Sequence, residues 1–169
     1  MSNHKGLIDG AVDLKDALRR IRSVADYQFG KGVGVKLFPE NVEIVRSKRT
    51  GRIRYVYLIG RRLATLRPTD GLFSLSIAGA KRIVEDVSSA RCLVIVQDDV
   101  SKFIAEGGDV FAKHVVKADS SIRPKDEVIV VDESNSVLAV GRAVLSGEEM
   151  EVFPKGVAVK VRRGCLEES

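Results

Sequence analysis

Cysteine is scarce in this chain of 169 residues, which contains only Cys92 and Cys165. Neither cysteine has a CxxC partner, and the two histidines, His4 and His114, are isolated as well. Structural zinc usually requires four Cys or His ligands at short spacings, and secreted disulfide scaffolds carry more cysteines than this. The sequence therefore predicts no metal site and no disulfide framework, and it predicts Cys92 as a small buried residue in a strand.

Long apolar segments are also missing. No apolar run approaches the roughly 20 residues that a membrane-spanning helix needs. The first twenty residues, MSNHKGLIDGAVDLKDALRR, lack the apolar core of a signal peptide. Hydrophobic residues make up 44% of the chain and charged residues 30%, which is typical of a folded globular protein. We expect a cytoplasmic protein with no membrane partner.

Acidic residues are absent from the whole stretch between residues 46 and 67. Residues 1–90 contain 17 Lys and Arg against 9 Asp and Glu, whereas residues 91–169 contain 11 against 14. The basic surplus therefore belongs to the first half of the chain. Ordinary surfaces mix the two signs of charge. An unmixed basic block favours an anionic partner, most commonly nucleic acid, over the alternative of a solvated charged face.

A recognisable catalytic constellation is missing too. Neither histidine has a nearby Ser or Cys nucleophile in a recognisable setting. The carboxylate pairs at residues 98–99 and 148–149 stand where helices are predicted to begin, and the helix dipole favours negative charge there. We therefore expect a protein without catalytic residues and without a cofactor. An enzyme in its own right is the less favoured alternative.

Three glycines surround a lysine in YQFGKGVG, residues 27–34. A phosphate-binding P-loop requires GxxxxGK[ST], but Lys31 is followed by Gly32. The dinucleotide fingerprint GxGxxG would need glycine at position 35, where Val35 stands. The segment instead favours a connector that bends at its glycines and leaves Gln28 and Lys31 pointing outward. It leaves open whether this connector contacts a ligand.

Hydrophobic periodicity predicts a small α+β domain in the first half. Apolar residues recur at helical spacing from Asp13 to Val24. The segments VEIVRSK, RIRYVYLIG, RLATLRP and LFSLSI read as strands of a curled antiparallel sheet, and AGAKRIVEDV reads as a closing helix. Alternation along the second strand predicts Arg52 and Arg54 on the face opposite Ile53 and Tyr55.

A boundary follows at SSARC, and residues 91–169 contain many short strands with two short helices. This pattern predicts a small, nearly closed pseudo-barrel. We expect Asp98 or Asp99 to cap the helix in DDVSKFIAEGG, and Gly107-Gly108 to end it. The predicted fold class is thus α+β, with an α+β domain at residues 1–89 and a β-strand pseudo-barrel at residues 90–169.

Particular segments also carry family resemblances. In the second half EGGDVFAKHVVKAD, IRPKDEVIVVDES, LAVGRAVLS and EEMEVFPKGVAVKV occur in an order that resembles a PUA domain, a small RNA-binding module. It departs from many PUA domains at His114 and Lys125, where those domains have glycine. In the first half ADYQFGKGVGVKLFP and EIVRSKRTGRIRYVYLIGRRLATLRPTDGLFSLSIAGAKRI resemble the domain that precedes the PUA module in archaeal tRNA-guanine transglycosylases and archaeosine synthases. From about Asp13 onward the chain is similar to the C-terminal half of those enzymes.

The large catalytic barrel of that family, with its aspartate nucleophile and cysteine-rich zinc site, has no counterpart in these segments. The resemblance therefore implies a non-catalytic protein that binds tRNA or another structured RNA. Such a protein would act in archaeosine-type tRNA modification, alone or as the recognition subunit of a split enzyme beside a catalytic partner. DNA is not expected as a ligand. The alternative is a translation-associated PUA factor that binds the ribosome or initiator tRNA.

The resemblance also implies a contact surface. Carried over from PUA domains, the implied RNA contacts are Gly107, Gly108, Phe111, Lys113, His114, Arg142, Lys155, Arg162 and Arg163. Phe111 would stack on an unpaired base, unless it belongs to the core, and the glycines would allow close backbone approach. The basic first half extends the predicted contacts to Lys31, Arg46, Lys48, Arg49, Arg52 and Arg54.

Overall fold

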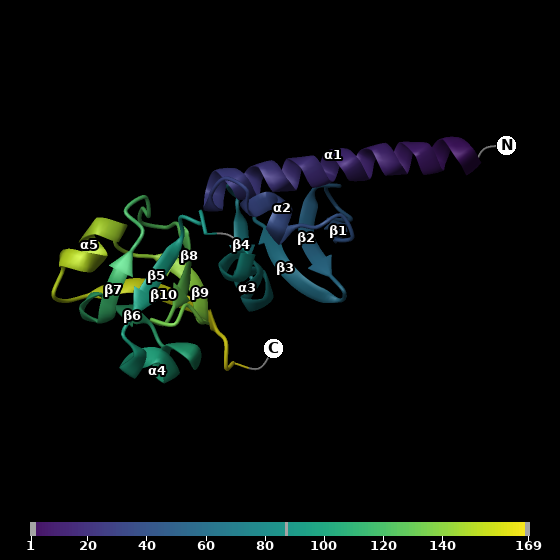
Figure 1. The fold of residues 1–169 in the computed structure, drawn as a ribbon. Coiled ribbons are helices and arrows are strands. Elements are labelled where there is room, and N and C mark those ends of the chain that lie inside the picture. The colour runs from purple at the N-terminus through teal and green to yellow at the C-terminus, as the bar shows by residue number, and fades with distance from the viewer. Residues whose placement is uncertain (1–2, 87, 168–169) are drawn as a thin grey trace.

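A computed structural model describes the fold of residues 3–86 and 88–167, and the side chains of residues 13–85 and 88–167. The long helix α1 (Asn3–Phe29) runs along one side of the molecule (Figure 1). One small sheet lies beneath α1, and a strongly curled second sheet lies beside the C-terminal end of the helix (Figure 1). None of the helices in the described ranges is long and apolar enough to cross a membrane.

The first sheet is antiparallel, as the sequence predicts. Its strands follow one another in chain order: β1 (Glu43–Arg46), β2 (Ile53–Leu58), β3 (Arg61–Leu66) and β4 (Phe73–Leu75). Val56 pairs with Ala64 and Ala64 with Leu75, and this buried row joins the core with α1, α2 (Val33–Leu37) and α3 (Ile77–Asp86). The first domain is therefore a sheet with helices on one face.

The expected strict alternation along β2 is wrong. Val45 pairs with Tyr55, but the next residue of β1 pairs with Ile53, so Arg54 is an extra residue in a β-bulge. A bulge shifts the side-chain alternation by one position. Ile53 and Val56 are therefore both buried although they lie three residues apart, and Tyr55 lies on the face opposite Val56.

The second sheet forms the predicted pseudo-barrel. Its six strands are arranged in the order β6-β10-β9-β8-β5-β7, in which β5 and β8 are parallel and the other pairs are antiparallel. The elements of this half are β5 (Leu93–Val96), η1 (Asp98–Val100), α4 (Ser101–Ala105), β6 (Val110–Phe111), η2 (Ala112–His114), β7 (Val115–Ala118), β8 (Glu127–Val131), β9 (Val137–Ala143), α5 (Gly147–Val152) and β10 (Val157–Gly164). The segment VFAKHVVKAD is thus two short strands separated by a 3₁₀ turn.

Strand β8 joins the two halves into one packed body. All five of its residues are buried, because each face of the strand packs against a different core. Ile129 and Val131 belong to the core beneath the first sheet, whereas Val128 and Val130 belong to the core inside the pseudo-barrel. The buried core therefore crosses the division between residues 89 and 90, and that division stays a prediction.

The helix ends correct one expectation and confirm two. Neither Asp98 nor Asp99 is the N-cap of a helix in DDVSKFIAEGG; the carboxylate of Asp98 instead accepts a hydrogen bond from the Glu133 backbone at 3.0 Å. Gly107 has a φ of 105°, a left-handed conformation that suits glycine, and it follows the end of α4 as predicted. Glu149 lies at the start of α5, where it forms a capping box with Ser146.

The YQFGKGVG connector bends against neighbouring backbone. A side chain at Gly34 would place its Cβ 2.2 Å from the Arg22 carbonyl oxygen, so this glycine lets α2 lie directly on α1. Gln28 does not point outward, because its amide bonds both the N–H and the carbonyl of Phe73, at 2.7 and 2.8 Å. Lys31 is exposed, as expected. The connector therefore fastens α1 to β4.

Candidate nucleic-acid interface

A basic groove of about 320 Å³ lies at one end of the first sheet. The residues that line it include four arginines and, within the described part of the chain, no acid: Arg49, Arg52, Arg54 and Arg67. They come from the loop between β1 and β2, from β2 itself, and from the end of β3. The fold thus brings three of the predicted contacts together and adds Arg67.

The hairpin loop is held by its own backbone and by the Ser47 and Thr50 hydroxyls, which accept from the Thr50 and Arg52 N–H groups. The Ser47 N–H donates to the Arg52 carbonyl at 2.7 Å, and the Gly51 N–H donates to the Ser47 carbonyl at 2.8 Å. Gly51 has a φ of 71°, which favours glycine in this tight turn. The Arg54 guanidinium lies 5.6 Å from the centre of the Tyr55 ring, a cation–π contact that orients it.

The other predicted contacts of the first domain lie outside this groove. The Arg46 guanidinium contacts the Asp13 carboxylate of α1 at 3.3 Å and the Gly51 carbonyl at 3.0 Å. Lys48 is exposed on the hairpin loop, and Lys31 is exposed in the turn after α1. Arg46 is thus engaged within the molecule.

Two predicted contacts of the second domain lie against each other. Phe111 and His114 are in edge-to-face contact, with ring centroids 6.4 Å apart, and Phe111 is 37% exposed. Lys113, which lies between them in the sequence, is part of η2 and is exposed. By contrast, a Cβ at Gly108 would lie 2.3 Å from the Phe103 ring, and one at Gly107 would lie 2.7 Å from the Glu167 carboxylate. The two glycines are packed against their own chain.

Arg162 lies where the two domains meet. Its guanidinium donates to both carboxylate oxygens of Glu127, at 2.8 and 2.5 Å, and to the Leu75 carbonyl at 2.7 Å. The Leu75 N–H donates to the same carboxylate at 2.6 Å. The side chain of Glu127 is fully buried, and its charge is matched by these donors. A contact predicted for RNA is therefore engaged in holding β4, β8 and β10 together.

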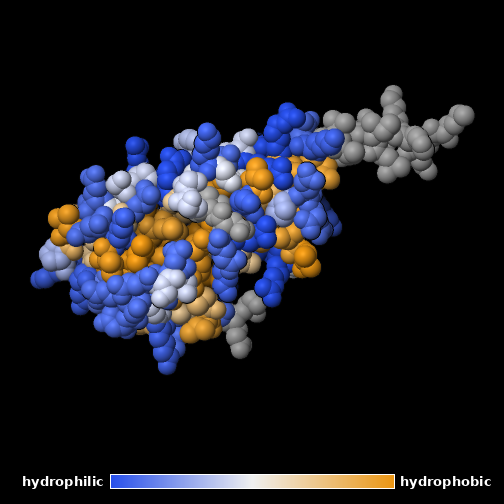
Figure 2. Space-filling model, in the orientation of Figure 1, coloured by the Kyte–Doolittle hydropathy of each residue, from blue (hydrophilic) through white to orange (hydrophobic). Residues whose placement is uncertain are grey.

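The remaining predicted contacts are exposed and dispersed. Arg142 lies on β9, Lys155 lies in the segment between α5 and β10, and Arg163 lies on β10. In the same domain Figure 2 shows a band of apolar surface. The exposed apolar residues of this domain include Phe103 of α4 and Val152 of α5. The second domain thus presents a more mixed surface than the basic groove.

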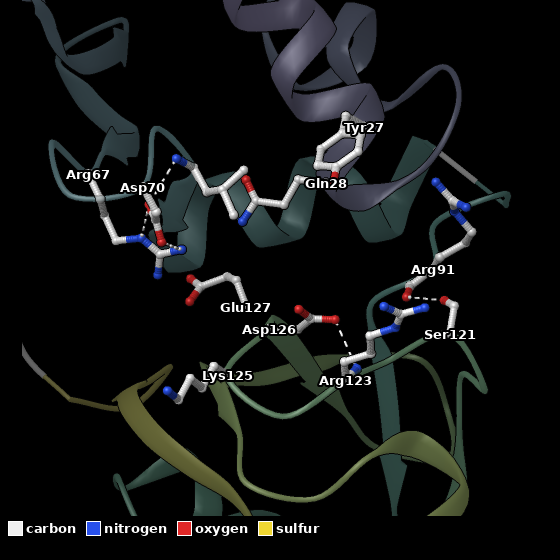
Figure 3. A pocket seen from close by; sticks show the side chains of 11 residues that line it. Tyr27, Gln28, Arg67, Asp70, Arg91, Ser121, Arg123, Lys125, Asp126 and Glu127 are labelled. Carbon is white, nitrogen blue, oxygen red and sulfur yellow. Dashed lines mark hydrogen bonds and ion pairs between the residues drawn. The ribbon is translucent and has the colours of Figure 1, made fainter.

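A larger cleft, of about 650 Å³, lies between the two domains (Figure 3). Arg67 and Asp70 stand at one end of it, and Arg91 stands at the other. Tyr27 and Gln28 reach it from the C-terminal end of α1, and the segment between β7 and β8 provides the opposite wall with Arg123, Lys125 and Asp126. Sequence reasoning missed this site because its residues come from separate segments. The basic residues of the RPKD turn were its only signal.

The acids that line the cleft are held by partners of their own. Burial acts to raise the pKa of Asp70, but hydrogen bonds from the Leu72 N–H and the Arg67 guanidinium outweigh it and lower the pKa. The charges of Arg67 and Arg142 act in the same direction. Asp126 accepts from the Arg123 N–H at 2.9 Å, and Glu127 is paired with Arg162.

No metal centre is formed within the described residues, where no three His, Cys, Asp or Glu side chains are grouped to hold an ion. The His4 side chain lies outside the described residues. Burial, followed by the charges of Glu127 and Asp119, raises the pKa of the Cys92 thiol to about 12. Cys92 is thus buried, as the sequence predicts, but it lies just before β5 rather than in a strand.

Each half of the chain matches a known protein domain. The patch-forming domain C2 of tRNA-guanine transglycosylase matches residues 19–89, and the PUA domain matches residues 93–165. The chain is 46% identical over 149 residues to the tRNA-guanine(15) transglycosylase of Thermococcus kodakarensis, a match that covers 88% of this chain and 25% of that enzyme. It is 42% identical over 150 residues to the enzyme of Methanobrevibacter smithii, covering 89% and 23%.

Solved structures share the fold over most of the chain. A hypothetical protein from Pyrococcus horikoshii OT3 has a TM-score of 0.72 at 24% identity, and the match covers 91% of this chain and 93% of that one. A conserved PUA domain protein from Thermoplasma acidophilum has a TM-score of 0.65 at 21% identity, covering 92% of both chains. At these identities the likeness concerns the fold alone.

The fold and these matches define a PUA-domain protein. Within that class, the chain has a match to a patch-forming C2 domain before its PUA domain and is similar to the C-terminal part of archaeal tRNA-guanine(15) transglycosylases. It spans about a quarter of the length of those curated relatives rather than half of it.

Proposed function

We propose that this chain is a tRNA-binding recognition module of archaeosine-type tRNA modification, without a catalytic site of its own. The observation that carries the proposal is the convergence of Arg49, Arg52 and Arg54 on one groove without an acid among its described lining residues. That groove lies in the domain that matches the patch-forming domain of tRNA-guanine transglycosylase. A PUA domain follows it, and its packing against the first domain makes the two a single platform.

The chemistry of the groove suits an RNA backbone. A-form RNA displays phosphates and 2′-hydroxyls along a shallow minor groove, which basic side chains contact without reading bases. Guanidinium groups bind phosphate through paired N–H donors. If each of the three hairpin arginines neutralises one phosphate, the slope of log K against log salt gains about 2 to 3 units from this groove alone.

In our proposal a separate partner protein catalyses the base exchange. The two matched domains account for residues 19–165, and the relatives are about four times as long as the segment they share with this chain. In this proposal the recognition module holds the tRNA, and a separate catalytic subunit performs the base exchange. Purified chain alone should therefore incorporate no base into tRNA.

The proposal is tested by fluorescence anisotropy with a labelled tRNA transcript across a salt series. A plain RNA hairpin and duplex DNA serve as competitors. The Arg52→Ala/Arg54→Ala variant should bind more weakly and with a shallower salt slope. Lys36→Ala/Lys81→Ala removes the same charge from α2 and α3, so it serves as the control and should behave as the unmodified protein. Equal binding to all three nucleic acids would contradict the proposal.

A further inference from the structure

The cleft between the domains contains more cations than its acids neutralise. Arg91, Arg123 and Lys125 are exposed, and no hydrogen bond or ion pair holds their charged groups among the described residues. Of the lining acids, Asp70 is paired with Arg67 and Glu127 with Arg162, whereas the Asp126 carboxylate accepts only a backbone N–H, that of Arg123, among the described residues. The cleft therefore offers three free cations from two segments of the chain to an anion of about nucleotide size.

Lys125 occupies a backbone conformation that is costly for its side chain. Its φ is 78°, in the left-handed region that favours glycine, while its N–H donates to the Ala143 carbonyl at 2.7 Å. Glycine would satisfy the same turn without strain. A lysine held there at a conformational cost, with its side chain lining a basic cleft, points to a use for the ammonium group.

The cleft adjoins the basic groove of the first domain. Arg67 lines both of them. Its Nη1 atom is buried and lacks a hydrogen-bond partner in the described part of the chain, although the rest of the guanidinium is paired with Asp70. A strand bound in the groove can thus continue past Arg67 into the cleft.

Tyr27 supplies an aromatic face at the edge of this space. Its side chain lies at the C-terminal end of α1, and the residue is 79% exposed, more than a packing role requires. The neighbouring Gln28 is fixed to β4, so the helix end that carries Tyr27 is held in place. Unpaired RNA bases stack well on exposed aromatic rings of this kind.

We propose that the interdomain cleft binds one unpaired nucleotide of the RNA that the basic groove holds. Phosphates of the bound strand contact Lys125 on one side of the cleft and Arg123 and Arg91 on the other, and the base lies against Tyr27. This inference rests on the proposed function, and it adds a site that spans both domains. Because one phosphate contact contributes about 0.7 to 0.9 to the salt slope, loss of the Lys125 contact should weaken binding about five- to eightfold at 0.1 M salt.

The decisive variant is Lys125→Gly, because strain relief and loss of the contact act on different observables. Its melting midpoint should be unchanged or higher, whereas its tRNA affinity should fall by the stated factor with a shallower salt slope. Lys125→Arg should retain the affinity, since it keeps the charge. Asn135→Gly is the matched control: Asn135 has a φ of 65° in the turn after β8, and its replacement should leave tRNA binding unchanged.

A second readout reports on the base. The chain has no tryptophan, so Tyr27→Trp introduces a single tryptophan at the cleft, which can be excited selectively over the two remaining tyrosines. Addition of tRNA should quench it by stacking, whereas heparin, a polyanion without bases, should not. GMP alone should not quench it at concentrations that saturate with tRNA, because it lacks the groove contacts. Quenching by GMP that is equally strong in the Arg52→Ala/Arg54→Ala background would show a mononucleotide site instead.

The outcomes separate the two proposals. If Lys125→Gly keeps the wild-type affinity and salt slope while Arg52→Ala/Arg54→Ala loses tRNA affinity, the cleft proposal is wrong and the groove proposal stands. Unmodified protein that binds none of the RNAs overturns both.

Discussion

Replacement of Arg162 by methionine should destabilise the whole molecule rather than only its surface. The change removes the cation that neutralises Glu127 of β8, whose fully buried side chain also accepts from the Leu75 N–H of β4. Loss of one member of a buried pair costs about 3 to 5 kcal/mol, because the other charge is left without a partner. Arg162 is 39% exposed, so water can reach part of the vacated space, and we expect about 3 kcal/mol.

Urea unfolding followed by circular dichroism measures this loss directly. Glu127→Gln added to Arg162→Met should restore much of the stability, because the amide oxygen still accepts from the Leu75 N–H and no charge remains buried. Arg46→Met is the matched control, since its ion pair with Asp13 is exposed and should change stability by less than about 1 kcal/mol. The reasoning would be refuted if Arg162→Met lost no more stability than this control, or if the double variant were less stable than both single variants.

Three further predictions concern thiols, acid and packing. Native protein should react with a thiol reagent at Cys165 only, because Cys92 is buried with its pKa raised to about 12, and both should react after unfolding. Asp70 has a pKa below its ordinary 3.8, so its contribution to stability is present above pH 3.8 and lost as the pH falls through the lowered value; Asp70→Asn should flatten that part of a pH–stability curve. Gly34→Ala should lower the melting midpoint strongly, since its Cβ meets backbone at 2.2 Å, whereas Gly32→Ala meets nothing within 4 Å and should cost only its left-handed φ, about 1–2 kcal/mol. An unaffected midpoint in Gly34→Ala would contradict the close packing of α2 on α1.

Local patterns were sufficient for most of the fold. The helical spacing after Asp13, the apolar run in β8 and the order of short strands each carry their own structural signal, so the antiparallel sheet and the pseudo-barrel were predictable. The bulge at Arg54 was not, because it depends on the pairing of two strands and leaves no mark in the alternation of one. A regular period in β2 therefore placed Tyr55 on the wrong face.

The candidate site was predictable only where its residues are neighbours in sequence. Arg49, Arg52 and Arg54 share a hairpin, so their charge pattern reveals a common surface. The cleft combines Tyr27, Arg91 and Lys125 from three separate segments, which only the packing of the domains brings together. The sign of a charge also does not reveal its partner. Arg162 reads as an RNA contact in sequence, yet its partner is a carboxylate buried between the domains.

The central claim is that the basic groove of the first domain contacts an RNA backbone. The most direct test is the slope of log K against log salt for a tRNA transcript, measured side by side for the unmodified protein and Arg52→Ala/Arg54→Ala. The account predicts a slope shallower by about 1.4 to 1.8 in the variant, the contribution of two phosphate contacts. Parallel slopes for the two proteins would show that these arginines do not contact the backbone, and the account would be wrong.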